Sequence, residues 1–454
     1  MSDGKPDEEG NSLGRRMKRY AQVGAGVGGI AAKVASQRVF GVTPNNDKTA
    51  RELKQALGGL KGPIMKVAQM LATVPDAVPA EFSLELSELQ SAAPPMGWPF
   101  VKRRMRAELG PGWEAKFKSF EHEASAAASL GQVHRAVAHD GTRLAVKLQY
   151  PDMQSAVDAD LNQLGLIFSI HRRLDQTVNT REIYAEIRAR LVEELDYERE
   201  AAHMRLYKNI FADEPRIAVP EVVDDLSTHR LLTMTWLDGA PILDFRDHKL
   251  AERNAIAEAM FTAWWRPFNQ YGVIHGDPHL GNYTVRDDLG ISLLDYGCIR
   301  VFPSTFVGGV VELYRALEAG DRDRAAHAYQ TWGFTNLTNE LIDVLNVWAS
   351  FIYAPMLDNR VRSIADGVKP ADYGRKEAFE VHQALKKLGP VTPPREFVFM
   401  DRAAIGLGGV FLHLGAELNF YKLFNQAIEG FETGKLGKRQ EAALKKAGVP
   451  ASLA

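Results

Sequence analysis

Two aspartates and an asparagine in the C-terminal half of the chain have the spacing that phosphoryl transfer uses. Asp277 is followed five positions later by Asn282, and Asp295-Tyr296-Gly297 begins thirteen residues after Asn282. Asp295 could bind a Mg²⁺ ion that bridges the phosphates of a nucleotide, while Asn282 binds a second ion and Asp277 orients the acceptor oxygen. The pattern therefore predicts a site that uses Mg²⁺ and ATP. His279 lies between these residues, but Mg²⁺ prefers oxygen ligands, so we assign it no role.

A lysine and a helix glutamate could form the phosphate-binding side of the same site. Lys147 closes the run Leu144-Ala145-Val146-Lys147 on a predicted strand, a pattern typical of a lysine that contacts the α- and β-phosphates. We expect Glu200 to be its ion-pair partner. The sequence leaves other partners open, because one predicted helix carries four acidic residues: Glu194, Asp196, Glu198 and Glu200.

A small-residue segment, Ala126 to Gln132, precedes the lysine strand where a glycine-rich loop would cover the phosphates. The Cβ of alanine limits close backbone approach and positive φ values, so the phosphates should be held differently. We expect four residues of this segment to contact the nucleotide: Ala126, Ala127, Ala128 and Ser129. This departure argues against an ordinary protein kinase.

The surrounding pattern supplies elements that could position these residues. Leucines and other apolar residues recur at helical spacing between Thr49 and Leu89, and a second amphipathic stretch ends at Leu109. Strands are predicted from Ser129 to Ala138 and from Thr142 to Tyr150, and a helical region from Asp158 to Asp213.

An extended run then ends at Trp236, before the turn Asp238-Gly239, which is our candidate boundary between two lobes. Met234 and Trp236 close this run, and we expect both to contact the nucleotide. The rest of the chain is predicted to be mainly helical.

Taken together, these motifs resemble the UbiB/ADCK (AarF-like) family of atypical protein-kinase-like proteins over about residues 45 to 430. Lys66-Val67-Ala68-Gln69 stands at the place of the family's KxGQ motif, and Glu194-Leu195-Asp196 looks like its ExD motif. Ala126 to Gln132 looks like its Ala-rich loop, and Glu200 matches its helix glutamate. Ala68 departs from the motif glycine, which puts close helix packing there in question while Lys66 and Gln69 remain.

The resemblance implies an α+β, bilobal, protein-kinase-like fold with an N-terminal helical KxGQ-type insert over the nucleotide site. In that arrangement Lys66 meets the acids Glu194 and Asp196 and occludes peptide substrates. It also implies Mg-dependent ATPase or kinase activity that supports ubiquinone or isoprenoid-lipid metabolism. The expected domains are a basic arm, the helical extension, the N-lobe and the C-lobe, at residues 1–45, 46–115, 116–238 and 239–454.

Composition and charge limit the class and the partners of the chain. Its 454 residues are 45% hydrophobic, with a formal charge of −2, so a globular protein without a general attraction for nucleic acid is expected. The single cysteine, Cys298, cannot form an internal disulfide, which fits a reducing, cytoplasmic location.

The N-terminal arm has a charge pattern suited to a membrane surface. All charged residues from Arg15 to Arg38 are basic, and the Gly- and Ala-rich stretch among them is about 13 residues, shorter than the roughly 20 needed to span a bilayer. We expect peripheral binding to anionic or isoprenoid lipid on the inner face of a membrane, alongside a lipid-biosynthesis complex. Neither a cleaved leader nor a C-terminal hydrophobic anchor is expected. A mobile arm, or a helix docked on its own domain, is the alternative.

Two other functions share the strongest motif. A small-molecule phosphotransferase of the aminoglycoside or choline kinase type also uses an HGD-x-x-x-x-N loop followed by a metal-binding aspartate. Lys66, Gln69, Glu194 and Asp196 argue against it, because that class has no need of them. A non-catalytic scaffold that senses nucleotide or lipid is the third possibility, and the presence of Lys147, Asp277, Asn282 and Asp295 argues against it.

Overall fold

The computed structural model divides the described part of the chain into two compact units. The described residues are 96–128, 130–151, 153–155, 157–158, 161, 180–277, 279–368, 373–374, 377, 380–381, 383–384 and 395–450. Of these, unit 1 takes the residues up to Glu198 together with Val222–Trp236, and unit 2 takes Arg199–Glu221 and those from Leu237 onward. The chain thus changes unit at Trp236, beside the expected turn, whereas Arg199–Glu221 groups with unit 2 and not with the expected N-lobe. The four domain ranges stay a prediction.

Unit 1 is built on an antiparallel sheet in the order β1-β3-β4-β6, with β2 also paired to β3. Its strands are β1 (Ser119–Phe120), β2 (Ala126–Ala128), β3 (Gly131–Val137), β4 (Arg143–Gln149) and β6 (Leu231–Thr235). The hairpin β3–β4 confirms the two predicted strands. Its turn contains Gly141 at φ 91°, a conformation that favours glycine, and the Asp140 carboxylate accepts the Thr142 amide.

The two faces of this sheet carry different chemistry, because residues paired across antiparallel strands point to the same side. Lys147 pairs with Val133, and the neighbouring pair, Leu148 with Gln132, therefore points to the opposite face. On the Gln132 face, β4 contributes Val146 and Leu148, which belong to the hydrophobic core of unit 1. On the Lys147 face lie Lys147 and Gln149.

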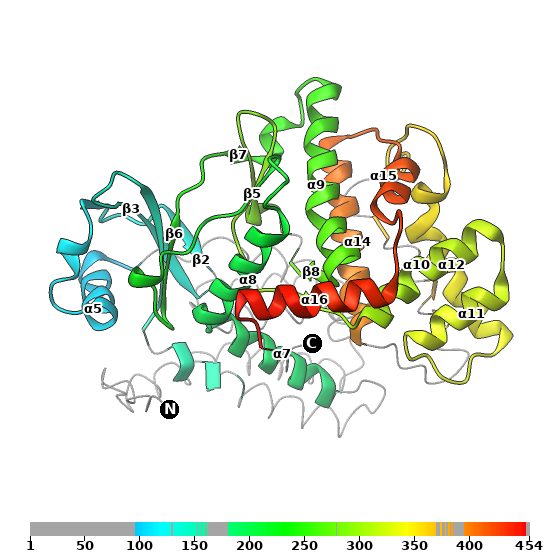
Figure 1. Cartoon of the computed structure of the whole chain (residues 1–454), viewed down its shortest axis with the longest axis horizontal. Helices are drawn as coiled ribbons and strands as arrows, with labels where there is room; N and C mark the ends of the chain where they lie inside the picture. The colour runs from blue at the N-terminus through cyan, green and yellow to red at the C-terminus, as the bar shows by residue number, and fades with distance from the viewer. Residues whose placement is uncertain are drawn as a thin grey trace, which may run out of the picture. The chain divides into compact units, whose positions relative to one another are not determined.

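Helix α5 (Trp98–Leu109) covers the core face of the sheet (Figure 1). It begins after Gly97 with a proline in its first turn, contributes Val101 and Met105 to the core, and ends at Gly110 with φ 89°. Its end at Leu109 confirms the predicted amphipathic stretch. Unit 1 also contains two 3₁₀ turns, η2 (Trp113–Lys116) and η3 (Asp224–Leu226).

A buried arginine ties α5 to the end of β4. The Arg104 guanidinium donates to the backbone carbonyls of Gln149 and Tyr150, each at 3.2 Å, and pairs with Glu108. Glu108 also accepts from the Thr228 hydroxyl and pairs with Arg230. Each charge therefore has several partners, which offsets the cost of burying it.

The predicted helical region contains a break, which corrects the expectation of one acidic helix. Helix α7 (Thr180–Glu194) ends at the first ExD residue, and α8 (Tyr197–Ile210) begins after the second. The last turn of α7 tightens through bonds from the Leu195 and Asp196 amides to carbonyls three residues back. The Tyr197 amide donates to His229 outside the helix, so the hydrogen-bond ladder cannot continue. The division into units falls inside α8, between Glu198 and Arg199.

Unit 2 contains the part of α8 from Arg199 onward, the long helix α9 and two small sheets. Helix α9 (Leu250–Tyr271) ends at Gly272, which adopts φ 62°, and strand β8 (Val273–His275) follows directly. β8 pairs antiparallel with β11 (Ile299–Val301). The other sheet has the order β5-β10-β9-β7, with strands β5 (Ile217–Ala218), β7 (Ala240–Pro241), β9 (Tyr283–Val285) and β10 (Ile291–Leu293). The 3₁₀ turns η4 (Ile242–Phe245) and η5 (Leu280–Asn282) lie within these connections.

The remainder of unit 2 is helical, and α14 lies beside α9 in Figure 1. Its helices are α10 (Ser304–Ala319), α11 (Arg322–Thr331), α12 (Asn339–Leu357), α14 (Arg395–Leu414), α15 (Phe420–Ala427) and α16 (Thr433–Ala447). These helices, together with sheets whose strands are antiparallel except for the parallel pair β5–β10, confirm the α+β class. Among the described residues, α12 alone is long and apolar enough to cross a membrane, and half of its apolar window is buried in the structure. Core helices meet the same criterion, so this is weak evidence for a span.

Candidate functional site

The segment after β8 forms a tight loop that brings Asp277 and Asn282 together. The Asn282 side-chain amide donates to the Asp277 carbonyl at 3.3 Å, and the Tyr283 hydroxyl donates to the same carbonyl at 3.2 Å. The Asp277 carboxylate accepts the His279 amide. The His279 ring in turn accepts the Gly281 amide, which caps η5. His279 therefore has a structural role in the loop.

The pairing of β9 with β10 places Asp295 next to this loop. Tyr283 pairs with Leu293, and the Leu294 amide donates to the Asn282 carbonyl at 3.0 Å. Asp295 follows directly, and its carboxylate accepts the Gly297 amide at 2.9 Å. The residues predicted to bind metal, Asn282 and Asp295, thus come from neighbouring strand ends.

The His275 ring forms hydrogen bonds with the backbone of both aspartates. Its Nε2–H donates to the Asp295 carbonyl at 2.7 Å, and its Nδ1 accepts the Asp277 amide at 3.3 Å. The ring is 2% exposed, so these two bonds fix its neutral tautomer and its orientation. The sequence motifs alone did not predict a role for this histidine. The only sign of it in the sequence was its position two residues before Asp277.

Glu200 lies in the same unit, near the Asp295-Tyr296-Gly297 turn. Burial raises the pKa of Tyr296 well above its ordinary value, and the negative charges of Asp295 and Glu200 raise it further. His203, one turn along α8, donates from Nδ1 to the Tyr296 carbonyl at 3.2 Å. Glu200 itself is 3% exposed. α8 is therefore joined to the turn that carries Asp295.

In unit 1, Lys147 lies beside Tyr197, the first residue of α8. The side chain is 9% exposed, and its Nζ lies 5.2 Å from the centre of the Tyr197 ring, within reach of a cation–π interaction. Gln149, on the same face of β4, donates from Nε2 to the Leu195 carbonyl at 2.6 Å. Neither Tyr197 nor Gln149 was identified from the sequence. Lys147 belongs to unit 1 and Glu200 to unit 2, so their pairing stays a prediction.

The Ala-rich segment is a strand where the sequence suggested a loop. Ala126, Ala127 and Ala128 form β2, in which Ala128 pairs with Gly131 of β3. Ala126 and Ala127 are exposed. Alanine tolerates the extended conformation that glycine would weaken, which is the physical reason for a strand here. Ser129 lies outside the described residues.

Met234 and Trp236, at the end of the β6 run, are in different surroundings. Met234 is buried on β6, opposite Ala145. The Trp236 amide donates to Arg143, and the Arg135 guanidinium stacks 4.3 Å from the Trp236 ring centre. Their proposed contact with nucleotide stays a prediction.

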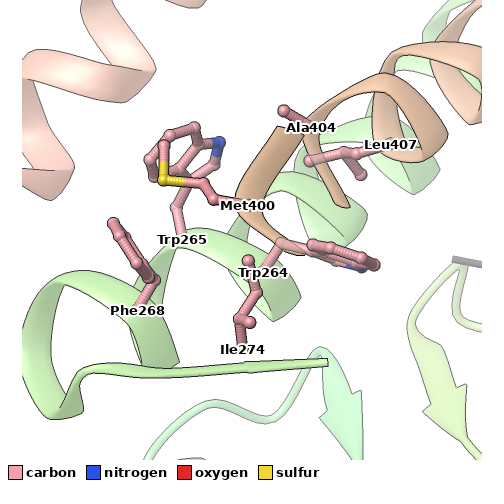
Figure 2. Close-up of a pocket in the computed structure, with 7 residues that line it drawn as sticks. All are labelled: Trp264, Trp265, Phe268, Ile274, Met400, Ala404 and Leu407. Atoms are coloured by element: carbon pink, nitrogen blue, oxygen red, sulfur yellow. The ribbon is translucent and has the colours of Figure 1, made fainter. Parts of the chain in front are cut away.

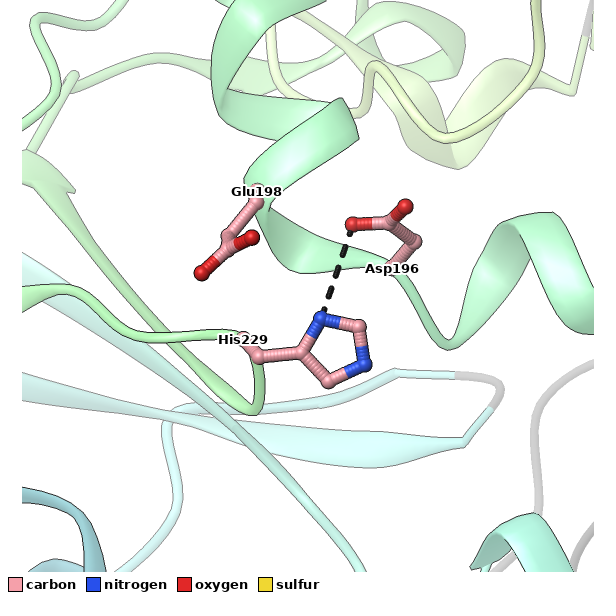
Figure 3. Close-up of side chains that lie close together, drawn as sticks. All are labelled: Asp196, Glu198 and His229. Atoms are coloured by element: carbon pink, nitrogen blue, oxygen red, sulfur yellow. Dashed lines mark ion pairs between the residues drawn. The ribbon is translucent and has the colours of Figure 1, made fainter. Parts of the chain in front are cut away.

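Asp196 and its neighbours form a small exposed group of possible metal ligands in unit 1. Figure 3 shows Asp196, Glu198 and His229 facing one another, with His229 Nδ1 3.7 Å from an Asp196 oxygen. The side chains of Asp196 and His229 are 39% and 58% exposed. An ordinary ion pair explains this geometry, so we assign no ion to it. Glu194 ends α7 beside this group, whereas Lys66 and Gln69 lie outside the described residues.

A small apolar cavity occurs in unit 2 between α9, β8 and α14 (Figure 2). Its volume is about 20 Å³, enough for roughly one water molecule. Apolar atoms line it, so a water there would lack partners, and it is a packing gap and not a ligand pocket. Its walls are Trp264, Trp265, Phe268, Ile274, Met400, Ala404 and Leu407.

The possible metal ligands in unit 2 are of the type that suits Mg²⁺ bound to a nucleotide. Asn282 and Asp295 supply oxygen atoms, the ligand type that Mg²⁺ prefers. The amide nitrogen of Asn282 is committed to Asp277, which leaves its oxygen as the atom suited to a cation. The lysine and small-residue strand of unit 1 have the residue types that phosphate binding uses.

Comparison with known proteins agrees with these motifs. The ABC1 atypical kinase-like domain matches residues 88–329. The mitochondrial atypical kinase coq-8 of Caenorhabditis elegans is 26% identical, over 93% of this chain and 58% of its own length. Atypical kinase COQ8 of Saccharomyces cerevisiae is 30% identical, over 64% of this chain and 60% of its own length. The chain thus spans about three-fifths of these relatives.

A solved structure, Rv3197 of Mycobacterium tuberculosis in complex with erythromycin, has a similar fold. Its TM-score is 0.59 at 25% identity, and the match covers 88% of this chain and 98% of that one. The likeness supports a kinase-like fold. With the domain match covering more than half of the sequence, the chain belongs to the ABC1/UbiB (COQ8/ADCK) family of atypical kinases.

Proposed function

We propose that this chain binds Mg-ATP and is an atypical kinase or ATPase that supports ubiquinone or other isoprenoid-lipid metabolism. The observation that carries the proposal is the arrangement around His275, which joins the Asp277 loop to the Asp295 turn through two hydrogen bonds. The names of the relatives from yeast and nematode, both atypical kinases, support the reaction class, and the metabolic setting is what the family resemblance implies.

The proposed roles follow the residue types and their places in the two units. Asp295 and Asn282 would hold Mg²⁺, which supplies charge stabilisation at the phosphates when bound. Asp277 would orient the attacking oxygen, and the buried His275 keeps the Asp277 backbone in place. Lys147, paired with Glu200, would contact the phosphates.

The remaining roles concern access and nucleotide contact. Lys66 and Gln69, together with Glu194 and Asp196, would restrict access to the site. Nucleotide contact is proposed for the β2 segment and for the end of β6: Ala126, Ala127, Ala128, Ser129, Met234 and Trp236.

Turnover of ATP tests this function directly. Hydrolysis should depend on Mg²⁺ and should rise with anionic liposomes, because the basic residues between Arg15 and Arg38 would gather the protein at such a surface. The same assay with small-molecule acceptors tests the phosphotransferase alternative. A folded protein that neither binds nor hydrolyses Mg-ATP would remove the proposal, whereas one that binds Mg-ATP without any turnover would favour a non-catalytic, nucleotide-sensing scaffold.

Lipid surfaces and a lipid-biosynthesis complex are the proposed partners, with the protein cytoplasmic or bound peripherally to the inner face of a membrane. Each lysine or arginine near an anionic surface contributes about 1 kcal/mol, and the attraction weakens with salt. Flotation with anionic liposomes should therefore decline with salt. Equal flotation of the full chain and of a chain lacking residues 1–40 would remove the role of the arm.

A second candidate function comes from the structural relative, which was solved with erythromycin. Binding of a macrolide by this chain would be consistent with the kinase-like fold. A thermal-shift titration with erythromycin, with and without Mg-ATP, distinguishes the two candidates. Stabilisation by erythromycin alone would favour macrolide binding, and stabilisation by Mg-ATP alone would favour the ATPase or kinase.

A further inference from the structure

The aromatic ring of Tyr197 contributes to the electrostatic surroundings of Lys147 in unit 1. The ammonium nitrogen of Lys147 lies 5.2 Å from the ring centre, within the roughly 6 Å over which an aromatic face attracts a cation. Both side chains are largely withdrawn from water, since Tyr197 is 2% exposed and Lys147 is 9% exposed. The attraction is stronger away from water, because water would solvate the ammonium and weaken its interaction with the ring.

A glycine leaves room for this ring on the Lys147 face of the sheet. Gly131 pairs with Gln149, which lies on the same side of β4 as Lys147. A Cβ added to Gly131 would lie 3.0 Å from the Tyr197 hydroxyl, which is closer than an ordinary van der Waals contact. The hydroxyl end of Tyr197 therefore lies against the backbone of β3 at the position where the sequence has a glycine.

Two hydrogen bonds hold the backbone at and before Tyr197. The Tyr197 amide donates to the His229 carbonyl at 3.3 Å, just before β6. Gln149 donates from Nε2 to the Leu195 carbonyl at 2.6 Å. Gln149 is on β4, the strand that also carries Lys147, so the start of α8 is tied to the lysine strand. The distance between the ring and the ammonium is thus set by the fold of unit 1.

We propose that Tyr197 is a positioning residue that holds the Lys147 ammonium in place for its contact with the phosphates of the nucleotide. That contact rests on the proposed function, whereas the effect of the ring on the lysine does not. An ammonium has three N–H donors, and an aromatic face attracts its charge without supplying a lone pair to any of them. All three donors therefore stay available for a carboxylate, predicted to be Glu200, and for phosphate oxygens.

Graded fluorination of the ring tests the attraction while the shape of the side chain is kept. Tyr197→Phe in the full chain is the reference, and further variants carry the same phenylalanine ring with increasing numbers of fluorine atoms, which weaken the negative face. Acetylation of Lys147 by dilute acetic anhydride, at one fixed pH, reports how strongly the ammonium form is held, because only the free amine reacts. We expect acetylation about tenfold faster with the fully fluorinated ring than with Tyr197→Phe, and intermediate rates between them. The exposed Lys118 of the same protein is the internal standard.

The same series of rings at Tyr150 provides the matched control. Tyr150 directly follows β4, is 2% exposed and belongs to the hydrophobic core of unit 1. Fluorination at Tyr150 therefore tests a general effect of fluorine in a buried ring, and the relative acetylation rate of Lys147 should not change. Equal rates of Lys147 acetylation across the Tyr197 series would show that the Tyr197 ring only fills space, and the proposal would be overturned.

Binding of Mg-ATP, measured on the same proteins, tests the positioning role and separates it from the proposed function. The affinity should fall stepwise with fluorination at Tyr197 and stay constant with fluorination at Tyr150. Graded acetylation of Lys147 with an unchanged affinity for Mg-ATP would refute the positioning role. A wild type that binds no Mg-ATP would remove the proposed function, and graded acetylation would still show that Tyr197 holds Lys147. Normal Mg-ATP binding by the wild type, with equal acetylation across the Tyr197 series, would do the reverse.

Discussion

Gln149 donates a hydrogen bond of 2.6 Å to the backbone carbonyl of Leu195, the central residue of the Glu194–Asp196 motif. Gln149 lies two residues after Lys147 on β4 and faces the same side of the sheet. The bond therefore ties the lysine strand to the break between α7 and α8. It satisfies the Leu195 carbonyl at the point where the helix ladder stops.

Gln149→Leu should destabilise unit 1, because the buried Leu195 carbonyl would lose its donor. The expected loss is about 1–3 kcal/mol of unfolding free energy, measured by urea denaturation. Gln154→Leu, at an exposed position, should change stability by less than about 0.5 kcal/mol. Equal denaturation midpoints for the two variants would contradict this role.

Asp295→Asn should nearly abolish Mg-dependent nucleotide binding, since it removes the negative charge from the proposed principal metal ligand. Its amide can keep the same shape, so folding should be retained. The exposed Asp287, changed to Asn, controls for a general loss of negative charge. Thermal shift with Mg-ATP measures the effect. An unchanged shift in folded Asp295→Asn would show that the metal assignment is wrong.

Local patterns predicted the elements best where the signal lies within a few residues. The alternation of β3 and β4, the turn at Gly141 and the end of α5 at Leu109 could all be read from the sequence. The adjacency of Asp277 and Asn282 followed from spacing alone. The change of helix at Leu195 could not be predicted in this way. It depends on the bond that the Tyr197 amide donates to the His229 carbonyl and on the bond that Gln149 donates to the Leu195 carbonyl, and both partners are distant in the chain.

The supporting residues of the candidate site were missed for the same reason. His275, His203 and Gln149 act through backbone carbonyls that only the folded chain brings near. Periodicity marks a residue as buried or exposed and says nothing of its hydrogen-bond partner. The position of the Ala-rich segment directly before β3 follows from the sequence. Whether its three alanines form a loop or a strand depends on their pairing with Gln132 and its neighbours, which the sequence does not reveal.

His134 should make stability depend on pH in the acidic range. Burial lowers the pKa of His134 from its ordinary 6.5, as does the nearby His122, whereas the bond to the Glu121 carbonyl and the Glu121 charge oppose this. The Phe120 ring covers the imidazole. Because the unfolded chain takes up the proton more readily, folding stability should fall as the pH drops below 6.5.

Urea denaturation at pH 7.5 and pH 5.5 measures this dependence. His134→Gln, which has no titratable group, should be less stable at neutral pH and should lose less on acidification. The difference should stay below about 1.4 kcal/mol per pH unit, the limit for one proton. Equal losses in the variant and the wild type would exclude His134 as the source.

Ala128 of β2 pairs with Gly131 of β3. Gly131→Ala and Ala128→Gly should have unequal effects on stability. A Cβ on Gly131 would lie 2.3 Å from the Leu148 carbonyl oxygen and 3.0 Å from the Tyr197 hydroxyl. The backbone beside Lys147 would have to move, so Gly131→Ala should be strongly destabilising. Ala128→Gly leaves these contacts intact and should cost only about 0.5–1 kcal/mol through added backbone freedom.

Ala128→Gly should nevertheless alter the affinity for ATP, because the freed segment could then approach the phosphates, and it should permit self-phosphorylation that the native strand disfavours. The native protein should hydrolyse ATP with little protein phosphorylation. ATP affinity, measured by titration, and phosphate incorporation into the protein should be compared between Ala128→Gly and Lys66→Ala. The comparison separates the contribution of the β2 segment from that of the helical insert. Ala128→Gly could leave ATP affinity and self-phosphorylation unchanged while Lys66→Ala changes them. In that case the helical insert restrains self-phosphorylation, and the β2 strand serves only as packing.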